Sequence, residues 1–171
     1  RHAMDYRSDL DFWRATKDAV PNSAKAHLNY SVMAGARGQM EVRLEESQLA
    51  QELAPDWAMA HVYTGDTLCR MGRHEEAWPH YVVGFEKGSN EKGLISLGLQ
   101  CLWDTKQLTV HEAELRKMVT DYPGSWLAYL ADDAREGRAP GSASDRDCAA
   151  MVELTFKDLG LDLERAPLTR L

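Results

Sequence analysis

The sequence lacks the features that mark several common classes of protein. Its 171 residues contain three cysteines, an odd number, and no two of them have C-x-x-C spacing. A disulfide framework needs paired cysteines and a zinc site needs clustered ligands, so neither is expected. We predict instead that Cys69 and Cys101 are small, partly buried helix residues.

Long hydrophobic runs and an excess of positive charge are also missing. No apolar run reaches the roughly 18 residues that a membrane-spanning helix requires. The net charge of −7 leaves no concentrated basic face to attract nucleic acid or anionic lipid. We therefore expect no nucleic-acid partner and no insertion of this chain into a membrane. With 44% hydrophobic and 27% charged residues, the composition is typical of a soluble globular protein.

Catalytic and metal-binding patterns are missing as well. No Ser-His-Asp, Cys-His or paired-carboxylate arrangement stands out by its spacing, and no phosphate-binding loop follows a predicted strand. His74 and His80 are six residues apart, whereas two histidines that share a metal on one helix are four apart. His27 and His61 are better explained as core residues. The sequence therefore predicts no enzyme, no metal and no cofactor.

What the sequence does contain is a repeated block. The segment 21–27 (PNSAKAH) is matched 34 residues later by the segment 55–61 (PDWAMAH). A further step of this length reaches Ser89, and the next reaches Pro123. Apolar residues recur at helical spacing inside the blocks, and proline, glycine and serine fall at the junctions. This pattern predicts tandem pairs of helices.

The 34-residue period resembles that of tetratricopeptide repeats. The match is clearest over 58–91, where Gly65 and Ala77 are expected to face one another as two helices approach closely. Tyr81 is expected to fill the space beside them. The resemblance implies an all-α fold: a right-handed α-α superhelix, or solenoid, of about eight or nine helices with a C-terminal capping helix.

The expected organisation is a single domain over residues 1–171. Gly38 should separate the two helices of the first repeat in a left-handed conformation. Ser8 and Asp11 have the spacing of a capping box at a helix start, and so do Thr109 and Glu112. The predicted parts are an N-terminal helix (5–20), repeat one (24–57), repeat two (58–91), a degenerate repeat three (92–125), a terminal helix pair (125–159) and a tail (160–171).

Two residues depart from the family pattern. Arg43 stands where the family usually has alanine, which predicts looser packing in repeat one or a side chain that reaches past the helix end toward solvent. Pro79 falls inside the second helix of repeat two and removes one backbone hydrogen bond. We expect it to bend that helix or to delay its regular start.

The first helices of successive repeats are expected to line a groove. An amphipathic aromatic residue, a flexible methionine and a few charges there suit a peptide or a helix better than a small polar substrate. The alternative is that these residues are ordinary solvated positions. The residues that the 34-residue register places in the groove are Lys25, Leu28, Asn29, Val32, Met59, Val62, Tyr63, Asp66, Arg70, Gln100 and Trp103.

The predicted function is therefore a scaffold that binds a peptide or a segment of a partner protein. Lys25 and Asn29 resemble part of the set with which some family members hold a terminal carboxylate. Met59 and Tyr63 stand where further members of that set are needed, so a carboxylate clamp is not expected. As a stand-alone repeat protein the chain is expected in the cytoplasm, and the sequence indicates no oligomeric state.

A narrower resemblance concerns the start of the chain. The segments 5–8 (DYRS), 12–13 (FW) and 21–30 (PNSAKAHLNY) look like the junction at which bacterial multi-span membrane glycosyltransferase-like proteins pass into their C-terminal repeats. His2 and Ala3 stand where that junction usually carries an Arg-Asn pair. This resemblance implies the alternative function: an accessory repeat domain on the periplasmic side of a membrane-bound glycosyltransferase that positions an acceptor.

Overall fold

The computed structural model describes residues 8–122, 124 and 125. This part of the chain is all-α, as predicted, with seven helices and no strand. None of these helices is long and apolar enough to cross a bilayer. Apart from Ser125, the predicted terminal helix pair and the tail lie outside the described residues. The helices are α1 (Asp9–Ala19), α2 (Ala24–Gly35), α3 (Met40–Leu53), α4 (Ala58–Arg70), α5 (His74–Lys87), α6 (Lys92–Asp104) and α7 (Glu112–Asp121).

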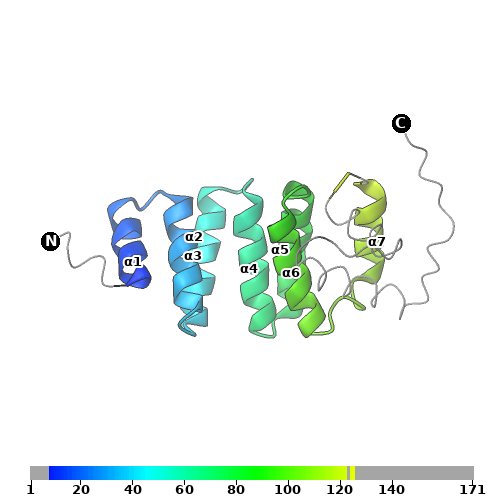
Figure 1. The fold of residues 1–171 in the computed structure, drawn as a ribbon, viewed down its shortest axis with the longest axis horizontal. Helices are drawn as coiled ribbons and strands as arrows, with labels where there is room; N and C mark the ends of the chain where they lie inside the picture. Colours follow the sequence, from blue (N-terminus) through cyan, green and yellow to red (C-terminus); the bar gives the residue numbers. More distant parts are fainter. Residues whose placement is uncertain (1–7, 123, 126–171) are drawn as a thin grey trace. The chain divides into compact units, whose positions relative to one another are not determined.

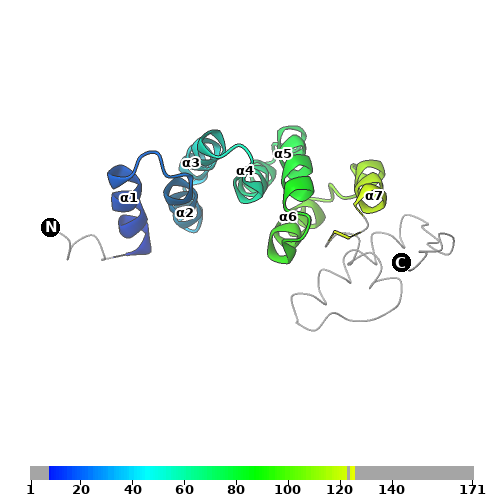
Figure 2. The same ribbon diagram turned by 90° about the horizontal axis from the view of Figure 1, so that it is seen from above.

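The chain divides into two compact units, the first ending at Gly88 and the second beginning at Ser89. The first unit contains α1 to α5 (Figure 1). In it, α2 pairs with α3 and α4 pairs with α5, which are the two helix pairs expected for repeats one and two. α2 also contacts α4, although α3 separates them in the sequence. Figure 2 shows α2 and α4 on one side of this unit and α3 and α5 on the other.

The Ser8–Asp11 cap predicted for the N-terminal helix is confirmed, although α1 begins at Asp9 and not at residue 5. Ser8 is its N-cap, and the Ser8 hydroxyl oxygen accepts the Asp11 N–H at 3.2 Å while donating to the Asp11 carboxylate at 2.8 Å. Leu10 is buried with Tyr30 of α2, and Trp13 packs against the same cluster. α1 therefore covers one side of repeat one.

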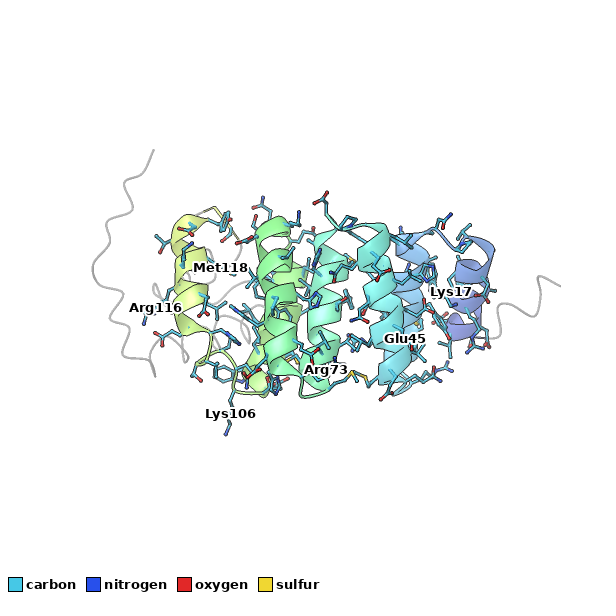
Figure 3. The ribbon with its side chains drawn as sticks, turned by 180° about the vertical axis from the view of Figure 1, so that it is seen from behind. Lys17, Glu45, Arg73, Lys106, Arg116 and Met118 are labelled. Carbon is cyan, nitrogen blue, oxygen red and sulfur yellow. The ribbon has the colours of Figure 1, made fainter. Side chains whose placement is uncertain are left out.

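The 34-residue step recurs in the backbone of the turns between paired helices. Gly38, Gly72 and Lys106 have positive φ angles of 76°, 77° and 59°. The left-handed break predicted at Gly38 is thus confirmed. Lys106, which lies in the turn after α6 (Figure 3), adopts the same conformation without being glycine. The next N–H in each turn donates to a carbonyl five residues earlier, which closes the helix in a Schellman-type turn. These bonds join Gln39 to Ala34, Arg73 to Leu68 and Gln107 to Leu102, at 3.1, 2.9 and 2.7 Å.

The start of α7 differs from the prediction. α7 begins at Glu112 with His111 as its N-cap, and no side chain caps it. The predicted capping box is wrong because a separate turn precedes the helix: the Gln107 carbonyl accepts the N–H groups of Val110 and His111 at 3.1 and 3.2 Å. Thr109 lies within this turn and donates its hydroxyl proton to the Lys106 carbonyl at 3.2 Å.

The close approach predicted within repeat two is confirmed. A Cβ atom added at Gly65 would lie 3.2 Å from both the Ala77 carbonyl oxygen and the Tyr81 ring, closer than ordinary packing allows. A Cβ atom added at Gly84 would overlap the side chain of Val62. α4 and α5 therefore meet through their two glycines, and larger residues at either place would force the helices apart.

Pro79 does not delay the start of α5. The helix begins at His74 and continues through Pro79 to Lys87. Because proline has no N–H, the Glu75 carbonyl lacks its usual intrahelical donor. Pro79 and Glu75 are both exposed, so water can satisfy that carbonyl. The bend that was the other expectation for this helix stays a prediction.

Candidate functional site

The candidate site is the side of the first unit formed by α2 and α4, which we call the α2–α4 face. The two helices carry the predicted groove residues of repeats one and two, and they contact each other directly. Gln100 and Trp103, the predicted residues of repeat three, are half-buried on α6 in the second unit. The α2–α4 face is therefore described with the residues of the first unit alone.

The predicted residues of this face differ in exposure. Leu28 and Val62, at 2% and 0% exposed, are packed between helices and do not open to solvent. Met59 and Tyr63 are half-buried and pack against a cluster that contains Leu28. The apolar part of the face is thus Met59 and Tyr63, supported from below by Leu28. The remaining exposed or half-buried residues are Lys25, Asn29, Val32 and Arg70.

Asp66 is a fully buried carboxylate at the centre of an ion-pair network. Its exposed fraction is 0%, and its Oδ2 atom lies 2.5 Å from Nη2 of Arg43 and 2.9 Å from Nε of Arg70. Arg70 is one turn further along α4, whereas Arg43 comes from α3 in the preceding repeat. A buried carboxylate is costly unless its charge is balanced and its oxygens are hydrogen-bonded, and the two arginines do both.

The position of Arg43 contradicts one of the two expectations drawn from the sequence, that its side chain reaches past the helix end toward solvent. Its side chain is only 11% exposed and turns toward α4, so it does not extend into solvent. Gly35 makes room for it, because a Cβ atom at that position would overlap the Arg43 side chain. The absence of a side chain at Gly35 and the large side chain at Arg43 compensate each other. Arg43 therefore connects α3 of repeat one to α4 of repeat two through its ion pair with Asp66.

Each of the two repeats also holds a buried histidine at the same place. His27 and His61 are 5% and 7% exposed, which confirms that both are core residues. Their Nε2 atoms each lie 2.8 Å from a backbone carbonyl oxygen, that of Pro21 and that of Pro55. A carbonyl can only accept, so Nε2 of each ring carries a proton and donates it.

The two histidines differ in what faces their second nitrogen. Nδ1 of His27 lies 2.6 Å from the Glu46 carboxylate, whose other oxygen is 3.3 Å from the Lys17 ammonium group. Thirty-four residues after Glu46 the sequence has His80, and its ring centroid lies 6.3 Å from that of His61. Nδ1 of His61 is buried and has no hydrogen-bond partner among the described residues. Repeat two has thus lost the carboxylate that repeat one supplies.

His80 is electrostatically perturbed by this arrangement. Burial lowers the pKa of His80 below its ordinary value, and the positive charge that His61 can carry lowers it further; Glu76, on the same helix, acts in the opposite direction. Among the residues that the structure describes, no three side chains of the metal-ligating types come together.

Comparison with known proteins assigns no relative. No family model, curated protein or solved structure matches the chain. What this protein does must accordingly be argued from its own residues and their contacts.

Proposed function

We propose that the chain is a tetratricopeptide-type repeat protein, a non-catalytic scaffold whose α2–α4 face binds a segment of another protein. The observation that carries the proposal is the contact between α2 and α4 (Figure 2). First helices of stacked repeats lie side by side in this way and form the binding surface of repeat proteins. The 34-residue recurrence of left-handed turns at Gly38, Gly72 and Lys106 supports this type of repeat.

The chemistry of the face favours a peptide of mixed character. Met59 and Tyr63 offer apolar surface that is already held in place by Leu28, so little conformational entropy is lost when a ligand packs there. Lys25 is exposed at the start of α2 and Arg70 at the end of α4. We expect the bound segment to place an apolar side chain on Met59 and Tyr63 and to carry acidic residues that reach Lys25.

Selection from a displayed peptide library tests this proposal. The chain is immobilised, peptides are selected on it, and the dissociation constant of the tightest one is measured by fluorescence anisotropy. The double variant Met59→Ala/Tyr63→Ala should weaken binding by about tenfold or more, because buried aromatic contacts supply much of the affinity of such interfaces. Lys25→Glu should weaken binding several-fold and reduce its salt dependence.

A matched control separates this face from the rest of the unit. Glu45 is exposed on α3, in the other helix layer (Figures 2 and 3), so Glu45→Ala should leave the dissociation constant unchanged. Circular dichroism establishes that each variant keeps its helical content. If binding survives the Met59/Tyr63 and Lys25 changes intact, or if no peptide can be selected, the α2–α4 face is not the binding surface.

A further inference from the structure

The starting point is a difference between two repeats that are otherwise alike. Both repeats bury a histidine whose Nε2 donates to a proline carbonyl. In repeat one the other ring nitrogen of His27 meets the carboxylate of Glu46 at 2.6 Å. In repeat two the equivalent partner of His61 is a second histidine, His80. The same backbone arrangement therefore holds a histidine–carboxylate pair once and a histidine–histidine pair once.

The two pairs respond differently to an added proton. In repeat one, a proton on Nδ1 of His27 has an acceptor and an opposite charge in Glu46. In repeat two, Nε2 of His61 already donates to Pro55, so an added proton goes to Nδ1, which is buried and has no acceptor among the described residues. Ring centroids 6.3 Å apart also leave the nitrogens of His61 and His80 too distant for a direct hydrogen bond.

The charged groups nearest the pair are already engaged. Glu76, on α5, accepts from Nε of Arg73 at 2.8 Å. Asp56, in the turn before α4, accepts from the Lys87 ammonium group at 2.6 Å, and it is 92% exposed. Among the described residues, neither of these carboxylates forms a hydrogen bond with a ring nitrogen of His61 or His80.

The buried and half-buried charged residues of the other helices packed against α4 are held in other pairs, and the remaining acidic residues of α3 are exposed. From α3, Arg43 is paired with Asp66 and Glu46 with His27. From α2, His27 is held by that same Glu46. A proton taken up between α4 and α5 therefore has no hydrogen-bonded carboxylate like Glu46 among the described residues, and Glu76 favours it only through its charge.

We propose that His61 and His80 form a proton-sensitive contact that loosens the packing of α5 on α4 when the pH falls from neutral to mildly acidic. Two neutral rings pack against each other without repulsion. Once both are protonated, two positive charges face each other in a largely buried place, and separating the helices restores their hydration. In repeat one the equivalent place holds the carboxylate of Glu46, so no second histidine faces His27 there. This goes beyond the proposed function, because it needs no ligand on the α2–α4 face.

The direction of the effect follows from the protons bound in each state. The pKa of His80 is lowered in the folded protein, mainly by burial, whereas in the unfolded chain it keeps its ordinary value near 6.5. Just below that value His80 therefore binds more protons in the unfolded chain than in the folded protein, and its contribution to stability falls as the pH decreases. The contribution of His80 to stability is therefore fully present above its ordinary pKa and is lost as the pH falls from there through the lowered pKa of the folded protein.

Exchanging the two kinds of pair is the test. The unfolding equilibrium of the full chain is measured in urea at about pH 7.5 and about pH 5.5 for the wild type, His80→Glu and His80→Gln. His80→Glu gives repeat two the pair of repeat one, and His80→Gln removes the second titrating ring. In the wild type, the unfolding constant should increase between about pH 7.5 and about pH 5.5 by up to about tenfold for each unit by which the pKa of His80 is lowered. Both variants should reduce this increase. Glu86→Gln, a change at an exposed residue of the same helix outside the pair, should keep that increase.

Two results would overturn the proposal. One is an unfolding constant that changes with pH in His80→Glu and His80→Gln as much as in the wild type. The other comes from the histidine ring resonances of the wild type, which need no variant to fold: His80 should titrate below its ordinary value, and at a higher pH in His61→Gln. A His80 resonance that titrates normally and ignores the His61 change would exclude the contact.

Discussion

Asp66 illustrates how a single buried charge joins consecutive helix pairs. It accepts from Arg43 of α3 and from Arg70 of its own helix, and Gly35 leaves space for the first of these arginines. Removal of Asp66 leaves two arginines without this partner, and one of them, Arg43, is largely buried. The network is therefore expected to matter more for stability than an exposed ion pair of the same length.

Asp66→Ala should be strongly destabilising. It leaves Arg43 buried without a counter-charge, and breaking a buried pair in this way costs about 3–5 kcal/mol. Arg43→Ala should cost less, because Arg70 still neutralises Asp66. Urea denaturation followed by circular dichroism measures both. A change below about 1 kcal/mol for Asp66→Ala, the range of exposed pairs, would contradict the network described here.

The role of Arg43 was not predictable from its own repeat. The register shows an arginine where repeat two has Ala77, which signals only a departure from the family pattern. Its explanation needs two further residues: Gly35 on the preceding helix and Asp66 on the following one. Gly35 aligns with Cys69 and Asp66 with Val32, so both positions also differ between the repeats. Three linked differences are the signal that a search by register could have used.

At the scale of the helices and turns, prediction succeeded where one local cause decides the structure. α2 and α3 together fill the predicted repeat one (24–57), because Ser23 caps the first helix and the left-handed Gly38 separates the two. It failed at α7, where the spacing of Thr109 and Glu112 matches a capping box but a prior turn at Gln107 takes up the residues. Sequence spacing alone does not distinguish a threonine that caps a helix from a threonine in a turn before the helix.

The shared turn allows a direct exchange between repeats. Lys106 has a φ angle of 59° at the place where repeats one and two have glycine. A left-handed conformation costs a residue with a side chain about 1–2 kcal/mol. Lys106→Gly should therefore stabilise the protein by up to about 1 kcal/mol, after the greater flexibility of glycine in the unfolded chain is subtracted.

Gly72→Ala is the reciprocal change. It places a side chain at a φ angle of 77° and should destabilise the protein by about 1 kcal/mol. No described atom lies within 4 Å of a Cβ atom built there, so a loss reports on the backbone and not on a clash. Thermal unfolding of both variants provides the comparison. Opposite signs are expected, and two losses of equal size would argue against a common turn.

For the whole molecule, the sequence predicted the helical class and the pairing of helices better than the use of individual groove positions. The 34-residue step places Leu28, Val62 and Asp66 on the α2–α4 face, yet all three are buried. The 34-residue alignment of the repeats predicts which side of a helix a residue occupies. It does not state how closely the neighbouring helix covers it, because that depends on the partners that meet there, such as Arg43 at Asp66.

The central claim is that this face receives a segment of another protein, and site-specific photo-crosslinking tests it most directly. A benzophenone amino acid is placed at Tyr63 in one sample and at Glu45, exposed on α3, in another; both are irradiated with the peptide selected on the wild-type chain. We predict a crosslinked product from position 63 and none from position 45. Crosslinking from position 45 alone, with none from position 63, would contradict the assignment of the α2–α4 face as the binding surface.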